Sequence, residues 1–99
     1  NDLMNAGGYR VSPLEVEAAL SGHPGIADVA VAERQVSETT SVICAYVVPR
    51  DGAAIDRDAL LAHATGKLAA YKRPKEVIVL DSLPRTANGK IMRRALALL

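Results

Sequence analysis

The stretch Ile26–Pro49, IADVAVAERQVSETTSVICAYVVP, decides how this chain folds. Its first part, Ile26–Glu33, is rich in valine and alternates along its length, which is typical of a β-strand. Its last part, Ser41–Pro49, is nearly all apolar, as expected for a central strand. The polar residues between them, RQVSETT, predict a turn, so we expect the two strands to pair antiparallel.

A helix is predicted just before this strand pair, in SPLEVEAALSG. Ser12 and Glu15 have the spacing of a capping box, and Pro13 falls at the first helical position. Glu15 and Glu17 are expected to face solvent. The opposite side carries an apolar stripe that consists of Val16, Ala19 and Leu20. Gly22 and a following proline end the helix.

A second helix and a third strand are predicted after the pair. Asp56 is a typical N-cap residue, and the apolar residues that follow it share one side of a helix that Gly66 weakens near its end. Those residues are Leu60, Leu61, Ala64 and Leu68. The segment YKRPK is expected to be an extended connector, because a residue before proline avoids the helical region. Glu76–Leu80 is predicted to be a strand, and KIMRRALALL a short amphipathic helix.

The N-terminal segment LMNAGGYRV reads as two short strands around Gly7 and Gly8. Together the elements predict an α+β fold: a small three-stranded sheet with an N-terminal β-hairpin and about three helices. We expect a single domain over residues 1–99. Because the chain opens at Asn1 without an initiator methionine, we interpret it as a piece of a longer protein.

The net charge of +1 hides an uneven distribution. Residues 1–66 hold four arginines against nine carboxylates, whereas residues 67–94 hold eight basic side chains against two carboxylates. A concentrated positive end attracts polyanions such as nucleotides, coenzyme A or nucleic acid. An ordinary solvated helix face with surface lysines explains the same charges.

The single Cys44 excludes an intramolecular disulfide framework and favours a reducing compartment, the cytoplasm. It is expected to be a small core residue. No apolar run is long enough to cross a bilayer, and no signal peptide opens the chain. His23 is expected to make a local hydrogen bond at a helix end, and His63 to lie on the polar side of its helix. No metal site is expected, since no other ligand stands at a suitable spacing.

The strongest candidate for chemistry is the segment LPRTANGKIMRR. Its Gly-Lys pair has the spacing of a P-loop, but Pro84 replaces the first glycine and Ile91 replaces the hydroxyl residue that binds Mg²⁺. The turn residues Asn88 and Gly89 tolerate positive φ and present Lys90 outward. A rigid loop that delivers one ammonium group suits stabilisation of charge developing on an oxygen. A plain surface turn is the simpler interpretation of the same residues.

Taken together, GGYRVSPLEVEAAL and LPRTANGKIMRRAL resemble the C-terminal domain of the adenylate-forming superfamily. That superfamily includes acyl- and aryl-CoA synthetases, adenylation domains of non-ribosomal peptide synthetases, and luciferases. The resemblance covers essentially the whole chain, in the right order. It implies a mobile lid that is inactive alone and works with its own N-terminal domain, which binds most of the ATP, the Mg²⁺ and the carboxylic acid substrate.

The resemblance implies that Lys90 is the adenylation lysine, which contacts the carboxylate and the α-phosphate of ATP. Gly89 would support its approach. The P-x-x-x-x-G-K context also resembles that of family members regulated by reversible lysine acetylation, so an acetyltransferase and a deacetylase acting on Lys90 are implied partners. Acetylation would remove the charge that the reaction uses.

The resemblance also implies a binding region for coenzyme A. Gly7, Gly8 and Tyr9 match the glycine loop that lines the pantetheine tunnel, although a plain hairpin turn explains two glycines as well. Arg10 is expected to meet a phosphate of coenzyme A or, alternatively, to pair with Glu17 or another surface acid. A second group, Arg73 and Lys75, matches positions that hold nucleotide phosphates of coenzyme A in some aryl-CoA ligases, with solvated surface charge as the alternative. Asn1 and Asp2 match the hinge, where Asn1 departs from the usual acidic pair.

These expectations define the lid of an acyl-CoA synthetase, which activates a carboxylate to acyl-AMP and, after rotation, guides coenzyme A. A second hypothesis is an adenylation-domain lid that serves a carrier protein. The third is a free-standing module that binds nucleic acid or another polyanion. The scarcity of aromatic residues for base stacking argues against this module, so no nucleic-acid partner is expected.

Overall fold

The computed structural model describes residues 3–99, so the predicted hinge, Asn1 and Asp2, lies outside the described residues. In chain order the elements are β1 (Met4–Ala6), β2 (Tyr9–Val11), α1 (Pro13–Ser21), β3 (Ile26–Gln35), β4 (Ser41–Pro49), α2 (Arg57–Thr65), β5 (Glu76–Val79) and α3 (Arg93–Leu96). Two single 3-10 turns, η1 (Arg50–Gly52) and η2 (Ala70–Lys72), complete them. Over residues 3–99, the α+β prediction is confirmed, with its hairpin, three-stranded sheet and three α-helices.

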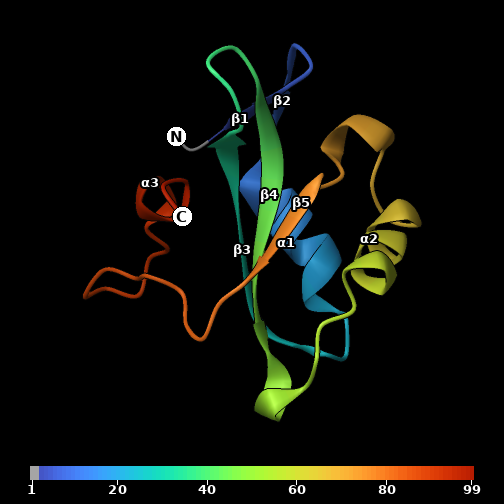
Figure 1. The fold of residues 1–99 in the computed structure, drawn as a ribbon, viewed down its shortest axis with the longest axis vertical. Coiled ribbons are helices and arrows are strands. Elements are labelled where there is room, and N and C mark those ends of the chain that lie inside the picture. The colour runs from blue at the N-terminus through green and yellow to red at the C-terminus, as the bar shows by residue number, and fades with distance from the viewer. Residues whose placement is uncertain (1–2) are drawn as a thin grey trace.

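The three-stranded sheet has the order β3-β4-β5, with β4 in the centre as predicted. β3 pairs antiparallel with β4, and β5 pairs parallel with β4. The return from β4 to β5 runs through α2, so this part of the chain is a strand–helix–strand crossover. Figure 1 shows α1 and α2 on one face of this sheet and α3 on the other.

Alternation along β4 divides the core into two clusters, one on each face of the sheet. Ile43, Ala45 and Val47 join the apolar faces of α1 and α2. Cys44 and Tyr46 join the other cluster, which the segment after β5 covers with Leu83 and Leu96. A strand buried on both faces has no place for charged side chains, which explains why Ser41–Pro49 is almost entirely apolar.

The capping box predicted for α1 is wrong. Ser12 occupies the N-cap position, but its side chain makes no capping hydrogen bond. Glu15 instead forms an ion pair with Lys72, with 2.8 Å between its Oε2 and the lysine Nζ. Glu17 was expected to face solvent, but it does not. Its carboxylate accepts a hydrogen bond from the Val31 N–H and forms an ion pair with Arg93. Tertiary partners have therefore replaced the local interaction.

The helix α2 begins as predicted, since the Asp56 side chain accepts hydrogen bonds from the backbone of Asp58 and Ala59. It ends at Thr65, before Leu68, whose side chain still packs in the same core cluster. The connector YKRPK is not extended throughout, because the 3-10 turn η2 includes its first two residues, Tyr71 and Lys72. Arg73, which precedes Pro74, takes the predicted extended conformation. None of the helices among residues 3–99 is long and apolar enough to span a membrane.

Candidate functional site

Residues 84–92 form a small β-like hairpin that we call the lysine hairpin. Arg85 and Ile91 face each other in an antiparallel bridge. The Met92 N–H donates to the Pro84 carbonyl at 2.9 Å, and the Thr86 N–H donates to the carbonyl of Lys90 at 2.8 Å. The predicted loop is therefore an ordered backbone ladder.

The tip of the lysine hairpin is closed by a tight turn. The Gly89 N–H donates to the Thr86 carbonyl at 2.9 Å, and Gly89 adopts φ +86°. This pattern is that of a turn followed by a left-handed residue, which is accessible to glycine without a Cβ penalty. Of the predicted pair, Gly89 alone takes a positive φ, whereas Asn88 does not. The Lys90 N–H donates to Thr86 Oγ1 at 3.2 Å, so the lysine backbone is fixed on both sides.

The Lys90 side chain projects from this tip and is exposed. Among residues 3–99, no hydrogen bond or ion pair holds its ammonium group. The geometry therefore combines an anchored backbone with a free cation. Such a group is available to an anion that approaches from outside the described chain.

A second predicted group gathers around a shallow groove of about 390 Å³, which we call the tyrosine groove. Its lining includes Gly7, Tyr9, Tyr71, Arg73 and Lys75, from two distant parts of the sequence. The rings of Tyr9 and Tyr71 pack together with centroids 4.5 Å apart and planes inclined at 33°. The groove therefore joins the N-terminal hairpin to the YKRPK segment and brings four of the candidate residues for coenzyme A together.

The glycine turn between β1 and β2 lies at the tyrosine groove, and Gly7 lines it. Gly7 and Gly8 adopt φ +57° and +88° in the turn between β1 and β2. Nothing lies within 4 Å of a Cβ built on either residue, so backbone conformation rather than crowding favours glycine here. Gly8 and Arg10 do not line the groove, and Arg10 is exposed without the Glu17 pairing considered above.

Arg73 and Lys75 have different environments. The Arg73 Nε donates to the Leu68 carbonyl at 2.9 Å and its Nη2 to the Thr65 carbonyl at 3.3 Å, so its guanidinium caps the end of α2. The Lys75 side chain is exposed at the groove. Of the two predicted phosphate contacts, Lys75 is therefore the more available.

Several basic side chains of residues 67–94 are bound inside the domain. Lys72 pairs with Glu15, whose hydrogen bond raises the pKa of Lys72, and lies 5.6 Å from the Tyr71 ring centroid. Arg85 pairs with Asp28, and the remaining pairing joins Arg93 to Glu17. These pairings reduce the free positive charge that the sequence alone indicates for this region.

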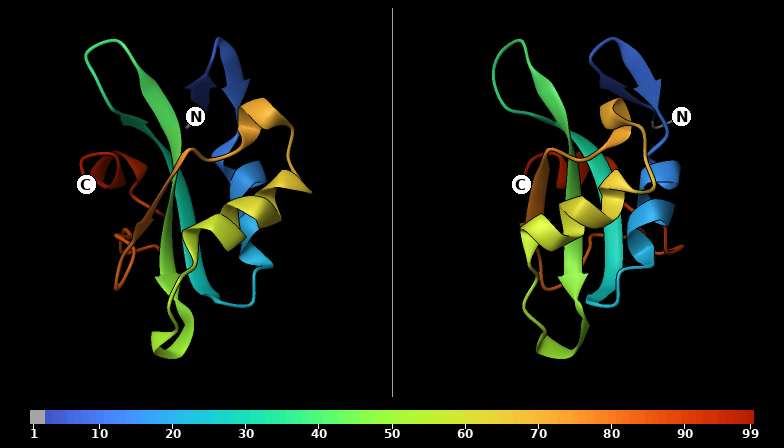
Figure 2. Two further views of the ribbon diagram at one scale, coloured as in Figure 1. Left: turned by 45° about the vertical axis from the view of Figure 1, so that its right-hand side comes forward. Right: turned by 90° about the vertical axis from the view of Figure 1, so that its right-hand side faces the viewer.

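The lysine hairpin and the glycine turn lie well apart on the molecule. In Figure 1 the β1–β2 hairpin stands at the top, and the orange-red loop after β5 extends to the lower left. The two additional views in Figure 2 keep the hairpin at the top, above the loop. The principal dimensions of the described chain are 37, 34 and 22 Å. The two features therefore lie at different ends of the molecule.

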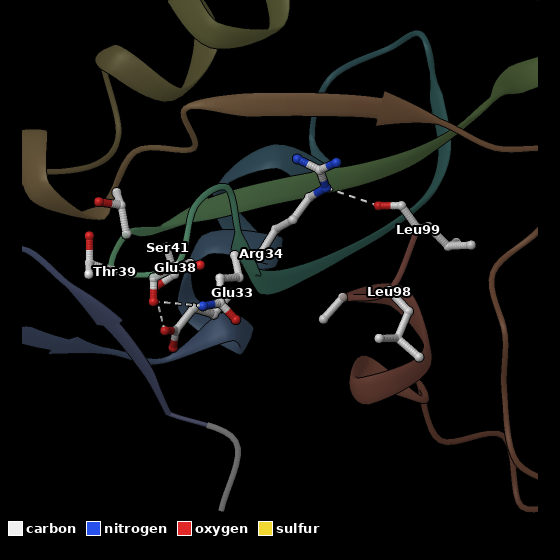
Figure 3. A pocket seen from close by; sticks show the side chains of 10 residues that line it. Glu33, Arg34, Glu38, Thr39, Ser41, Leu98 and Leu99 are labelled. Carbon is white, nitrogen blue, oxygen red and sulfur yellow. Dashed lines mark hydrogen bonds between the residues drawn. The ribbon is translucent and has the colours of Figure 1, made fainter.

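A larger open hollow of about 770 Å³ contains none of the predicted site residues. Figure 3 shows it between the β3–β4 turn and the C-terminal residues, where the Arg34 Nε donates to the Leu99 carbonyl at 2.9 Å. Its sides include Glu33 and Glu38. We assign no catalytic role to this hollow, because its polar side chains form hydrogen bonds with other residues of the fold.

The remaining reactive side chains have structural environments. His23 accepts a hydrogen bond from the Gly25 N–H at 3.1 Å, as predicted. His63 packs edge-on against His23, with centroids 5.4 Å apart, and its Nε2 is buried. His63, expected on the polar side of its helix, is therefore half-buried against His23. Cys44 is fully buried, and burial raises the pKa of its thiol to about 11, which fits a core residue. In residues 3–99, no three His, Cys, Asp or Glu side chains could hold a metal together.

The sequence matches the family described as the AMP-binding enzyme C-terminal domain over residues 15–90. The chain belongs to this family. It is 44% identical over 97 residues to a probable CoA ligase from Humulus lupulus and 38% identical over 96 residues to acetyl-coenzyme A synthetase from Deinococcus radiodurans. These alignments cover 97% of this chain but only 18% and 15% of the two relatives.

Solved structures show the same relationship. MatB from Rhodopseudomonas palustris matches 98% of this chain with a TM-score of 0.90 and 36% identity. The o-succinylbenzoate CoA synthetase from Bacillus subtilis, in complex with its acyl-adenylate intermediate, matches 96% with a TM-score of 0.87 and 35% identity. This chain spans 19% of each of those chains. Its fold is thus that of the C-terminal domain of CoA ligases and acyl-CoA synthetases.

Sequence reasoning missed the side chains that anchor the lysine hairpin. Arg85 was counted only as positive charge, yet it bonds both the hairpin tip and β3. Arg93 was likewise counted as charge, yet it joins α3 to α1 and β3. Their carboxylate partners, Asp28 and Glu17, are distant in sequence. The sequence offers one weak signal for these contacts: Arg85 lies before the Gly-Lys pair and Arg93 lies after it.

Proposed function

We propose that this chain is the mobile lid of an acyl-CoA synthetase and that Lys90 supplies the cation for its adenylation step. The observation that carries the proposal is the exposed Lys90 ammonium, which has no partner among residues 3–99, on an anchored hairpin. In this reaction the carboxylate attacks the α-phosphorus of ATP, forming acyl-AMP and releasing pyrophosphate. Negative charge develops on phosphorus oxygens, and a positioned ammonium stabilises it.

The rest of the active site is expected on the N-terminal domain of the complete protein. We propose that this domain binds the carboxylic acid, most of the ATP and Mg²⁺, and that the lid completes the site when it closes. The relatives support this division, because the chain covers less than a fifth of their length. One MatB structure is described as ATP-bound.

For the second step, we propose that the lid rotates and presents the tyrosine groove. The thiol of coenzyme A then attacks the acyl-adenylate, and AMP leaves. Gly7 and Gly8 let a thin pantetheine arm pass close to the backbone, and Lys75 is placed to pair with a phosphate. The large separation between the lysine hairpin and the glycine turn supports a rotation between the two steps.

An acceptor carried by a protein, in place of free coenzyme A, is the second candidate. Lys75 at the groove favours free coenzyme A, since it offers a cation to the nucleotide phosphates. The internal pairing of Lys72, Arg85 and Arg93 argues against a polyanion-binding module. Regulation by acetylation of Lys90 and a cytoplasmic location are further parts of the proposal, supported by the exposed amine and by the buried lone thiol.

The test compares both half-reactions in the complete protein. Lys90→Ala is expected to lower the rate of pyrophosphate release by about 10²–10³-fold, the usual loss on removing one such group. Thioester formation from supplied acyl-adenylate should stay within about twofold of wild type, because that step does not use this ammonium. Lys67→Ala, which removes another exposed ammonium, is the control. Equal losses in both half-reactions would contradict the proposed division of labour.

A further inference from the structure

Arg85 makes two contacts that together connect the tip of the lysine hairpin to the sheet. Its Nη1 donates to the carbonyl of Gly89 at 2.9 Å, and its Nη2 bonds Asp28 Oδ2 at 2.7 Å. Gly89 immediately precedes Lys90. One planar guanidinium thus spans from a strand of the core to the peptide unit that carries the lysine.

The anchor at the sheet is itself fixed. Asp28 lies in β3, where the register shifts between Ile26 and Asp28. Its Oδ1 accepts a hydrogen bond from the Val29 N–H at 3.0 Å, while its Oδ2 receives Arg85. Both carboxylate oxygens are therefore engaged, and the orientation of the carboxylate is set by the backbone of a core strand.

The hairpin needs such an anchor. A two-stranded hairpin is marginally stable by itself, and the tip residues Thr86 to Lys90 are all exposed. Besides its internal hydrogen bonds, the tip is fixed to the sheet by Arg85. Without that contact, the exposed tip is expected to open and to tilt against the sheet more readily. A displacement of about 1 Å at a catalytic group can cost a factor of about 10² in rate.

We propose that Arg85 is a positioning residue that orients Lys90 for the adenylation step, with Asp28 as its anchor. This inference rests on the proposed function of Lys90. The Arg85 and Asp28 side chains are 41% and 39% exposed, so their ion pair contributes little to overall stability. Its effect is instead on the direction in which the ammonium points.

The experiment uses the complete protein and six variants: Arg85→Ala, Arg85→Lys, Asp28→Asn, Lys90→Ala, the double variant Arg85→Ala/Lys90→Ala, and Arg94→Ala as a control. Arg85→Ala should lower kcat for adenylation by about 10–100-fold, with KM for ATP changed less than about threefold. Thioester formation from supplied acyl-adenylate and the melting temperature should stay near wild type. Arg85→Lys keeps the charge but loses the two-armed geometry, so it should restore little.

Three further readouts separate positioning from a simple surface ion pair. Asp28→Asn should give a smaller loss in kcat than Arg85→Ala, because the amide oxygen of asparagine can still accept a hydrogen bond from Arg85. Hydrogen exchange of residues 85–91 should accelerate in Arg85→Ala, while an exposed control, Arg94→Ala, leaves it unchanged. In single-turnover assays, Arg85→Ala should cost nothing further in the Lys90→Ala background, since it acts only through that lysine.

The outcomes are distinct. If Lys90→Ala leaves adenylation intact, the proposed function fails, and with it this inference. If Lys90→Ala slows adenylation but Arg85→Ala does not, Arg85 has no positioning role. The role is also overturned if Arg85→Ala costs the same factor with and without Lys90. Equal slowing of both half-reactions with a lowered melting temperature would instead make Arg85 a residue of fold stability.

Discussion

Arg93 binds both carboxylate oxygens of Glu17, with its Nη2 at 2.9 Å from Oε1 and 2.8 Å from Oε2. Both residues also bond the backbone of Val31, Glu17 at its N–H and Arg93 at its carbonyl. One cluster thus joins α1, β3 and α3. The side chains are only 16% and 13% exposed, so this pair differs from the solvated pair of Arg85 and Asp28.

This cluster is expected to hold α3 against the sheet. Replacing Arg93 by alanine leaves the Glu17 carboxylate partly buried and unpaired, which should cost about 2–3 kcal/mol of local stability. Hydrogen exchange of the α3 amides in the complete protein should accelerate by about 30–150-fold. Arg94→Ala, at the exposed neighbouring position, is the matched control. Equal exchange in the two variants would show that the cluster does not hold this helix.

Gly89 offers a test of backbone conformation at the lysine hairpin. Its φ of +86° costs a residue with a Cβ about 1–2 kcal/mol, although no atom lies within 4 Å of the added carbon. Gly89→Ala should therefore slow adenylation and leave thioester formation near wild type. Gly89→Asn should be milder, because asparagine tolerates positive φ better. Steady-state rates of pyrophosphate release would separate them, and equal activity of all three proteins would exclude a conformational requirement.

The two cations of the tyrosine groove should respond differently to truncation. Lys75→Ala is expected to raise KM for coenzyme A by about tenfold without lowering stability, because its ammonium is exposed at the groove and can pair with a phosphate. Arg73→Ala removes the donors that cap the Leu68 and Thr65 carbonyls, so it should lower the melting temperature as well. Kinetics at varied coenzyme A and thermal melting measure both effects. The reverse pattern would assign the phosphate contact to Arg73.

Burial of Cys44 predicts a loss of stability in alkaline solution. Burial raises the pKa of the thiol from 9.0 to about 11, and burial also raises the pKa of the neighbouring Tyr46. The folded state thus retains protons that the unfolded chain loses, so the stabilisation is complete below pH 9 and falls as pH rises toward 11. The loss of unfolding free energy that comes from Cys44 alone should reach about 2 kcal/mol near pH 10.5.

Urea unfolding at several pH values measures this loss. Cys44→Ala removes the thiol titration and should flatten the profile between pH 9 and 11. Tyr46→Phe removes the second titration and also the buried hydroxyl, which has no hydrogen-bond partner among residues 3–99. Identical slopes in wild type and Cys44→Ala would mean that the thiol does not ionise on unfolding.

The sequence predicted those parts of the fold that depend on local pattern. The apolar run of β4, the Asp56 cap of α2 and the glycine turn are readable because neighbouring residues determine them. The capping box failed because Lys72, from a distant segment, takes the Glu15 carboxylate. Glu17 was misplaced for the same reason, since its partner Arg93 lies 76 positions away. Side-chain pairing over such separations has no local signature.

The candidate site divides in the same way. Lys90 and Gly89 were recognisable because a short turn carries both, and Gly7, Tyr9 and Lys75 were grouped through resemblance alone. The structure brings these three to one groove. The structure also shows that Arg73 and Lys75 have different contacts. The Arg73 guanidinium bonds carbonyls at the end of α2, whereas Lys75 is exposed at the groove. The roles of Arg85 and Asp28 required coordinates, because they depend on where β3 passes the lysine hairpin.

The ring pair of Tyr9 and Tyr71 has a practical consequence for spectroscopy. The chain contains three tyrosines and neither tryptophan nor phenylalanine, and the third tyrosine, Tyr46, is buried in the core. Light of a wavelength that only tryptophan absorbs therefore excites no side chain of this domain. A single Tyr71→Trp substitution would make the groove its sole long-wavelength emitter, and quenching of that fluorescence would report, in real time, when another surface covers it.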